Sequence, residues 1–294
     1  MREGVVAAPG AFNGLVARAV ARAGFDAAYV SGAAVSASAG VPDIGLVTLD
    51  GFCSIIRQVS AASGLPVLAD ADTGFGEVEM VARTVHAYTD AGAAGLHIED
   101  QVFPKRCGHL EGKRLIAIDH FQEKVAAGAR ARDAIAARTG DRPVICARTD
   151  ARGVEGMPAA IERATAYVEA GADMIFPEGL TSEAEFAEFS AAMAGLAGES
   201  RRGGPYLLAN MTEFGKTPTI PLARFGELGY DLVIFPVTTL RIAMRAVEDA
   251  LLELARDGSA EGLLPRMQTR AELYDLLGYT PGEAWTYPGP TRPQ

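Results

Sequence analysis

Short apolar runs bounded by glycine or proline recur along the whole chain. Each run is too short for a helix and does not alternate with polar residues, which predicts a strand buried on both faces. Four of the runs follow a helix-like segment that ends in glycine, a residue that takes the left-handed conformation at helix ends. The predicted strands lie within residues 23–32, 91–100, 170–179 and 228–237, and within 4–10, 66–74, 143–150 and 205–213.

Amphipathic segments separate these eight runs at a spacing of roughly 30 residues, with Val78–Tyr88 and Ala159–Val168 as clear examples. Eight alternating strand and helix units predict an α/β fold, a closed (β/α)8 barrel of the TIM type. A doubly wound open sheet is the alternative. The glycine-rich dinucleotide fingerprint that often marks that fold does not follow the first predicted strand.

The C-terminal region departs from this repeat. Residues 263–277 have the pattern of one more helix, outside the eight units, and the stretch after Tyr279 is rich in proline and glycine. We therefore predict a barrel domain over residues 1–258. Residues 259–294 are predicted to form a C-terminal helix and irregular tail that pack on the barrel or on a neighbouring subunit.

Composition narrows the class of protein. The chain has 294 residues, 49% of them hydrophobic, and a formal net charge of −10, which argues against nucleic-acid binding. It has no run of 18 apolar residues, and no basic segment followed by an apolar one at the N-terminus, so we expect neither a membrane span nor a signal peptide. The three cysteines, at 53, 107 and 146, are too widely spaced for a disulfide framework or a zinc site, so a reducing cytoplasm is expected.

Polar residues follow six of the eight predicted strands. In a (β/α)8 barrel the catalytic groups lie at the C-terminal ends of the strands. A single carboxylate there is often only a helix cap or turn former, but six strands with polar ends on one rim predict a functional site. The residues concerned are Ser31 and Gly32, Asp70 and Asp72, Glu99 and Asp100, Arg148 and Asp150, Glu178, and Asn210 and Thr212.

The stretch DADTGFGE, residues 70–77, is the densest part of this rim. Alternation along a strand places Asp70 and Asp72 on the same side, where two like charges need a cation or a raised pKa. Oxygen ligands without a nearby histidine or cysteine favour Mg²⁺, with Mn²⁺ as the second choice. An acidic turn without a metal is the simpler alternative. We interpret His97, within a strand, as a core histidine.

Several motifs, in order, resemble the isocitrate lyase and phosphoenolpyruvate mutase superfamily, and within it the 2-methylisocitrate lyase branch. They cover the chain from about Tyr29 to Asp275. KRCGH favours the lyase-like members, while NMTEFG and MQTR-ELY are more particular to the methylisocitrate lyases. The motifs are YVSGAAVSAS, GVPDIGLVTLD, DADTGFGE, GLHIEDQVFPKRCGHLEGK, ARTDA, IFPEG, LLANMTEFGKTP and MQTRAELYD.

The resemblance implies a Mg²⁺-dependent retro-aldol cleavage of 2-methylisocitrate to pyruvate and succinate, as in propionate catabolism through the methylcitrate cycle. Asp72 would bind the metal directly or, with Asp70, through waters. Ser31, Gly32 and Ala33 would hold the keto-acid end. The remaining substrate-binding residues that it implies are Cys107, Gly108, Arg148, Glu178, Asn210, Met211, Thr212, Arg241 and Arg270.

The same resemblance gives Cys107 a chemical role. Cleavage leaves succinate as an enediolate that needs a proton on carbon, and a thiol with a pKa of ~8.5 is a workable acid near neutral pH. Lys105, Arg106 and His109 would tune this thiol. An ordinary loop cysteine is the simpler interpretation, and Tyr29 would then be the leading candidate for the acid. Cys53 and Cys146 lie in apolar stretches and are predicted to be inert core thiols.

Members of the superfamily are usually tetramers that exchange terminal helices, so a homotetramer is expected, with residues 263–277 as the exchanged helix. Other functions stay open. Isocitrate lyase differs only by the substrate methyl, and a pocket discriminates a methyl by only ~1–3 kcal/mol. A phosphonate mutase or an oxaloacetate-type hydrolase would use the same rim. A non-catalytic barrel is the remote alternative, against which the set of Asp70, Asp72, Cys107 and Arg148 argues.

Overall fold

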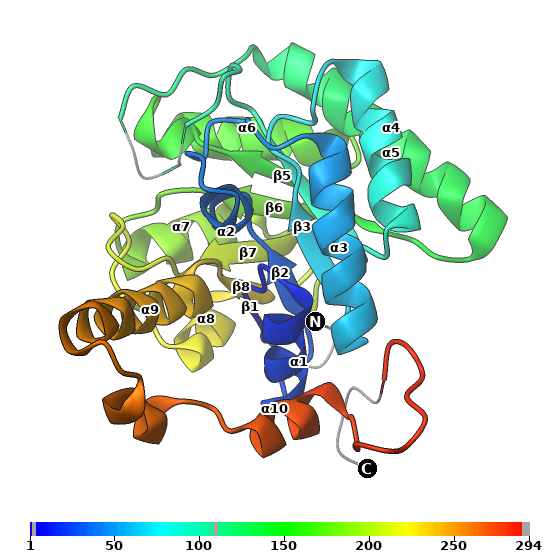
Figure 1. Cartoon of the computed structure of the whole chain (residues 1–294). Helices are drawn as coiled ribbons and strands as arrows, with labels where there is room; N and C mark the ends of the chain where they lie inside the picture. Colours follow the sequence, from blue (N-terminus) through cyan, green and yellow to red (C-terminus); the bar gives the residue numbers. More distant parts are fainter. Residues whose placement is uncertain (2–3, 107, 109–110, 290–294) are drawn as a thin grey trace.

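The computed structural model describes residues 1, 4–106, 108 and 111–289. Eight parallel strands form a nearly closed barrel with helices around it, which confirms the predicted (β/α)8 fold (Figure 1). The described strands are β1 Val6–Pro9, β2 Ala28–Val30, β3 Val67–Asp70, β4 Gly95–Glu99, β5 Val144–Thr149, β6 Met174–Pro177, β7 Tyr206–Asn210 and β8 Leu232–Phe235.

The strand order excludes the doubly wound alternative. Neighbours run β1-β8-β7-β6-β5-β4-β3-β2, so the first strand pairs with the last, and every pairing is parallel. At the remaining seam β1 and β2 meet through a single parallel bridge between Gly10 and Tyr29, where the Ala11 N–H donates to the Tyr29 carbonyl at 2.8 Å. The barrel is therefore closed except for a weak ladder between β1 and β2.

Helices follow the strands as the sequence pattern predicts. They are α1 Gly14–Arg22, α2 Gly32–Ser38, α3 Leu49–Ser63, α4 Val78–Asp90, α5 Ile118–Thr139, η1 Ala151–Gly153, α6 Met157–Glu169, α7 Glu183–Met193, α8 Leu222–Leu228, α9 Thr238–Asp257, η2 Glu261–Arg266 and α10 Arg270–Leu277. The four glycines of the helix-ending pattern all have positive φ, between 86° and 102°, at positions 24, 92, 171 and 229. No described helix is long and apolar enough to cross a membrane.

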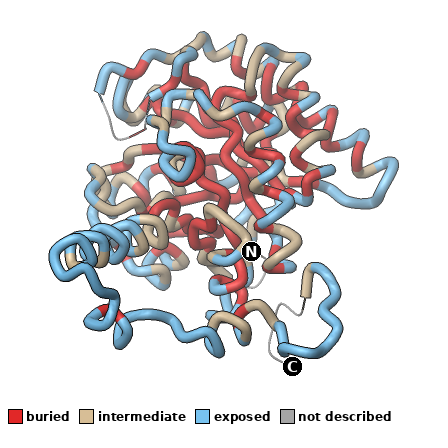
Figure 2. Tube along the Cα trace, in the orientation of Figure 1, coloured by how far each residue is buried: buried red, intermediate tan, exposed pale blue. Residues whose placement is uncertain are grey.

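Two apolar layers hold the barrel together. The larger layer lies between strands and helices and includes Ile56, Phe121 and Phe189. The smaller layer fills the barrel interior with side chains such as Cys146 and Phe176. Figure 2 shows the strands as the buried centre of the molecule. Cys53 and Cys146 are both buried in these layers, so the prediction of core thiols is confirmed.

The C-terminal region is more divided than the sequence pattern predicted. Residues 263–277 are not one helix, because η2 ends at Arg266 and α10 begins after Thr269. The Thr269 hydroxyl accepts a hydrogen bond from the Glu272 N–H while the Glu272 carboxylate accepts one from the Thr269 N–H, a capping box that starts a new helix. Helix α10 packs against α1 of its own barrel, where Arg22 and Asp275 form an ion pair of 2.9 Å.

Helix α9 differs from the other long helices because none of its residues is buried. In Figure 2 it projects from the barrel as an almost entirely exposed tube. Its apolar residues recur at alternating steps of four and three, the spacing of a coiled-coil seam. This seam consists of Leu240, Met244, Val247, Leu251 and Leu254.

Candidate active site

Strand alternation explains which polar side chains meet inside the barrel mouth. Along β5, Ile145 and Ala147 pack outward against helices, whereas Cys146 points into the interior. Arg148 is two residues further, so it enters the same interior at the C-terminal end of the strand, where its guanidinium lies 5.1 Å from the Phe176 ring. The same two-residue step leads from apolar interior residues to polar rim residues on β3, β6 and β7.

A small cavity of about 60 Å³ opens at this end of the barrel. It brings together nine of the residues predicted from sequence: Tyr29, Ser31, Ala33, Asp70, Gly108, Arg148, Glu178, Asn210 and Thr212. It adds Asp43, which sequence reasoning did not select, and an apolar side. The apolar lining residues are Phe176, Ile234, Pro236 and Val237. Asp43 lies in the GVPDIG motif, so the resemblance was a usable signal for it.

An acidic cluster lines one side of the cavity around a lysine. Lys105, only 3% exposed, places its ammonium 2.8 Å from Asp72 Oδ1 and 2.5 Å from Asp43 Oδ1. The buried pair of Asp70 and Asp72 therefore has a cation beside it, which the sequence pattern required but did not identify. Carboxylates raise the pKa of Lys105 against the effect of burial, which lowers it, so the ammonium stays charged.

The two aspartates differ in their surroundings. Burial alone would raise the pKa of Asp70, but the interactions with His97, Lys105 and Arg148, together with the hydrogen bond from the Asp72 N–H, outweigh it and lower the pKa. Asp70 also accepts hydrogen bonds from the Gly32 N–H at 3.1 Å and the Asp72 N–H at 2.9 Å. Burial, followed by the charge of Asp70, raises the pKa of Asp72 to about 6. The surroundings therefore favour the ionised form of Asp70 more strongly than that of Asp72.

Glycine at position 32 allows this arrangement. A Cβ there would lie 2.6 Å from Asp70 Oδ2 and 3.5 Å from Asp72 Oδ1, so both carboxylates face the start of α2. Ser31 caps that helix, because its hydroxyl accepts a hydrogen bond from the Ala34 N–H at 3.3 Å. The SGAA turn thus presents the backbone N–H of Gly32 directly to Asp70.

The donor set suits a hard divalent cation. Glu99 is 1% exposed, and its Oε1 has no hydrogen-bond partner among the described residues. Burial raises the pKa of Glu99 well above its ordinary value, as expected for a carboxylate that lacks a sufficient cation. Within the described residues no three histidine, cysteine or acidic side chains surround one point as ready ligands. Lys105 occupies the centre of the cluster.

Arg148 stands opposite, within a network of buried carboxylates. Its guanidinium donates to Asp150 at 2.9 and 3.1 Å and lies 3.2 Å from Glu99 and 3.4 Å from Glu178. Burial would lower the pKa of Arg148, but Asp150 and the other carboxylates raise it well above its ordinary value. Asn210 donates to Glu178 at 3.1 Å. The planar fork of Arg148 is thus charged and oriented at the cavity wall.

Tyr29 lines the cavity from β2 and forms a hydrogen bond with His97 on β4, two strands away in the sheet. Its hydroxyl lies 2.8 Å from Nε2 of His97, whose Nδ1 lies 3.8 Å from Asp70 Oδ1. Burial lowers the pKa of His97 to about 4 and, with the charge of Asp70, raises the pKa of Tyr29 well above its ordinary value. Both groups are neutral near pH 7, and His97 is a buried histidine with a partner, as the sequence predicts.

Gly108 places the KRCGH loop against this network. A Cβ on Gly108 would lie 2.5 Å from Nη2 of Arg148 and would collide with Glu178, so only glycine fits here. Cys107 and His109 lie outside the described residues, and the role expected for the thiol remains a prediction. Met211 does not line the cavity. Its side chain packs in the outer apolar layer and accepts a hydrogen bond from the Ile220 N–H.

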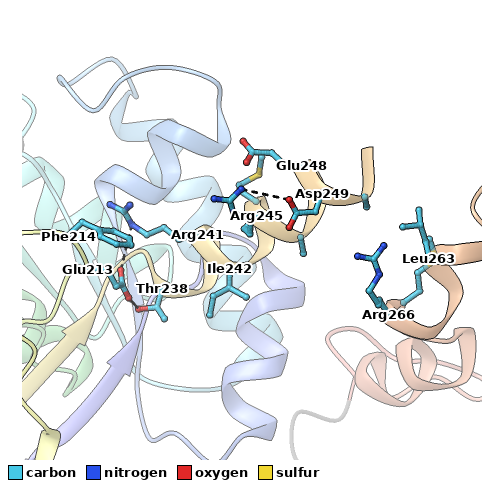
Figure 3. Close-up of a pocket in the computed structure, with 14 residues that line it drawn as sticks. Glu213, Phe214, Thr238, Arg241, Ile242, Arg245, Glu248, Asp249, Leu263 and Arg266 are labelled. Atoms are coloured by element: carbon cyan, nitrogen blue, oxygen red, sulfur yellow. Dashed lines mark hydrogen bonds and ion pairs between the residues drawn. The ribbon is translucent and has the colours of Figure 1, made fainter. Parts of the chain in front are cut away.

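The two C-terminal arginines lie elsewhere in the subunit. Arg241 lies 3.6 Å from Glu213 and stacks over Phe214 at 5.2 Å, at one end of a separate groove of about 880 Å³ between α9 and η2 (Figure 3). Arg270 is exposed at the start of α10. Neither lines the cavity that holds Arg148.

Comparison with known proteins defines the family. The model described as phosphoenolpyruvate phosphomutase matches residues 1–255. The chain belongs to this family. Its members include the probable 2-methylisocitrate lyase 1 of Corynebacterium glutamicum, with 53% identity over 92% of this chain and 84% of the relative. The 2-methylisocitrate lyase of Aeropyrum pernix has 49% identity over 95% of this chain and 84% of its own.

Solved structures of family members share the fold. The crystal structure of 2,3-dimethylmalate lyase, described as a PEP mutase/isocitrate lyase superfamily member, superposes with a TM-score of 0.85 at 38% identity, covering 94% of this chain and 88% of that one. A phosphonopyruvate hydrolase in complex with oxalate and Mg²⁺ gives a TM-score of 0.79 at 29% identity, covering 93% and 90%. The superfamily predicted from the motifs is thereby confirmed.

Proposed function

We propose that this protein is a Mg²⁺-dependent carbon–carbon lyase that cleaves 2-methylisocitrate to pyruvate and succinate, as propionate breakdown through the methylcitrate cycle requires. One observation carries the proposal. An acidic cluster and a carboxylate-binding arginine face each other across one cavity at the barrel mouth, in a chain 53% identical to a relative named as a 2-methylisocitrate lyase. No feature of the chain requires export from the cytoplasm.

The acidic cluster is the proposed metal site. Asp70 and Asp72 would hold Mg²⁺, or Mn²⁺ in its place, directly or through waters, with Glu99 as a further oxygen donor. The low pKa of Asp70 favours it as the direct ligand, since Asp72 is already paired with Lys105. The bound cation would supply Lewis-acid stabilisation of the oxygen that becomes the pyruvate carbonyl.

The remaining residues divide the substrate between them. The N–H groups of the turn Ser31–Ala33 would hold the pyruvate half beside the metal. Arg148 would bind a carboxylate through two parallel hydrogen bonds, and Glu178, Asn210 and Thr212 would bind the succinate half. The hydroxyl proton would pass to a carboxylate of the acidic cluster, and the electron pair of the oxygen would form the pyruvate carbonyl. The electron pair of the broken carbon–carbon bond would move to the carbon next to the succinate carboxylate.

That carbon needs a proton, which we assign to Cys107. Gly108, the next residue, touches Arg148 and Glu178, so the chain at this point reaches the proposed succinate half. Tyr29 is the second candidate. Its phenol lines the cavity, but burial raises its pKa well above the ordinary value, which makes it a weak acid for the step.

We further propose a homotetramer in which subunits exchange α9 together with η2 and α10, so that α10 would pack on the α1 of a neighbour in place of its own. The exposed seam of α9 and the groove between α9 and η2 support this assignment, since an apolar seam with heptad spacing suits a second helix. Arg241 and Arg270 lie on or beside these elements. In an exchanged assembly they would be offered to substrate carboxylates at a neighbour's cavity.

A panel of acids tests the function. The purified protein with Mg²⁺ is offered 2-methylisocitrate, isocitrate, oxaloacetate and phosphonopyruvate in parallel. We expect the highest kcat/KM for 2-methylisocitrate, because the cavity has an apolar side formed by Phe176, Ile234 and Val237 that can accept the methyl group. A preference for isocitrate would assign the protein as an isocitrate lyase, and turnover of either of the last two acids alone would assign the hydrolase or mutase activity. Inactivity on all four would favour a non-catalytic barrel.

A further inference from the structure

Lys113 is a buried cation that the proposed mechanism does not use. It ends the KRCGHLEGK motif, and its side chain is only 4% exposed. Its ammonium donates one hydrogen bond to the carbonyl of Gly108 and a second to Oδ1 of Asp150, at 2.8 Å for the latter. One side chain thus joins the backbone of the residue next to Cys107 to a carboxylate at the end of β5.

The Asp150 end of this connection is rigid. Asp150 is fully buried and accepts two hydrogen bonds from the Arg148 guanidinium, while its own N–H donates to Asp100 Oδ1 at 3.0 Å. Asp100 accepts further bonds from the hydroxyls of Thr149 and Tyr167. Lys113 is therefore anchored to the same carboxylate that orients the proposed substrate-binding arginine.

The Gly108 end leaves almost no freedom of position. Gly108 lies against Arg148 and Glu178 so closely that a single added carbon would collide with both. Its carbonyl points to Lys113 rather than to solvent. A shift of the chain at Gly108 would change the distance between Cys107 and the proposed succinate half, because the two residues are adjacent in sequence.

We propose that Lys113 is a positioning residue that fixes the KRCGH loop relative to Arg148, and so sets the geometry of proton delivery. The proposal rests on the function proposed above. A buried ammonium is costly unless acceptors surround it, and here both acceptors belong to groups whose relative placement the reaction needs. Removing the ammonium frees the Gly108 carbonyl and leaves Asp150 with Arg148 as its remaining cation partner.

The test compares two buried lysines. Lys113→Met removes the ammonium but keeps an unbranched side chain. Lys124→Met is the matched control, since Lys124 is 4% exposed and forms no hydrogen bond with Gly108 or Asp150. We expect Lys113→Met to lower kcat by about 10²-fold, the cost of a misplaced reacting group, with little change in KM. Lys113→Arg should restore part of the loss, and Lys124→Met should stay near wild type.

A second measurement needs no substrate. The rate of Cys107 alkylation by iodoacetamide is followed by peptide mass spectrometry, so that Cys53 and Cys146 do not interfere. We expect faster alkylation in Lys113→Met than in the wild type and in Lys124→Met, with Lys113→Arg between them. Equal alkylation rates and equal kcat in the two methionine variants would overturn the proposal. A lower kcat with unchanged alkylation and no recovery by arginine would also overturn it, by reducing Lys113 to a structural role.

The two proposals can fail separately. If the wild type does not cleave 2-methylisocitrate, the proposed function fails, whereas the alkylation rates still show whether Lys113 holds the loop. If the wild type is active and either of the two overturning results is found, only the role of Lys113 fails.

Discussion

The barrel mouth and helix α9 break the rule of apolar inside and polar outside in opposite directions. At the mouth, Asp70, Glu99 and Arg148 are at most 8% exposed. On α9, Leu251 and Leu252 are 58% and 71% exposed. Buried charge is tolerated only where opposite charges or a bound cation compensate it, and exposed hydrocarbon on this scale marks a surface that a partner covers. Each region therefore has the surface that is expected where a protein binds something beyond the single chain.

Removal of the metal is expected to have the largest effect on the activity proposed for the barrel mouth. We expect EDTA to abolish turnover and Mg²⁺ or Mn²⁺ to restore it, because Lys105 supplies one positive charge for four nearby carboxylates. Asp70→Ala should lower kcat/KM by at least about 10³-fold, as the loss of several kcal/mol of Lewis-acid stabilisation implies. Steady-state assays with metal-stripped protein decide the matter, and full activity without metal would contradict the assignment.

The two aspartates provide an internal control for that experiment. The resemblance implies that Asp72 binds the metal directly or, with Asp70, through waters, whereas we propose Asp70 as the direct ligand because Lys105 already pairs with Asp72. Calorimetric titration of Mg²⁺ into Asp70→Ala and Asp72→Ala ranks them. The variant that binds Mg²⁺ more weakly is the one that has lost the direct ligand. Tighter binding by Asp70→Ala than by Asp72→Ala would therefore favour Asp72 as the direct ligand.

Cys107→Ser tests the acid at the mouth. Serine is nearly isosteric but far less acidic, so the fold and binding of pyruvate and succinate with Mg²⁺ should persist while turnover falls by ~10²–10⁴-fold. Iodoacetamide should inactivate the wild type, and the two products should protect it. Near-normal kcat in the serine variant would transfer the role to Tyr29.

Leu251→Glu tests whether the exposed apolar seam of α9 is a subunit interface. A charge in the middle of the α9 seam should dissociate the assembly. It should have little effect on the fold of the barrel, because none of the residues of α9 is buried. Arg256→Glu is the control, because it introduces the same side chain on α9 at a position that is already polar and exposed and that does not line the groove. Light scattering that shows the same mass for both variants and the wild type would remove α9 from the subunit interface.

Much of this could be read from the sequence. The glycine-punctuated apolar runs specified all eight strands, because buried parallel strands leave a local pattern that needs no knowledge of the partner strand. Side chains alternate between the two faces of a strand, and Asp70, Arg148, Glu178 and Asn210 stand at or near strand ends. The sequence therefore also predicted that these four residues lie on one rim. These features depend on backbone geometry that each segment carries by itself.

The tertiary structure decided what local pattern could not. The partner of Asp72 is a lysine from the loop after β4, and the anchor of Arg148 is shared with Lys113, both set by contacts across the barrel mouth. The placement of Arg241 over Phe214, the division of residues 263–277 into η2 and α10, and the exposure of the α9 seam depend equally on packing. Electrostatic partners and helix docking are properties of distance in space, which hydrophobic periodicity along a chain does not encode.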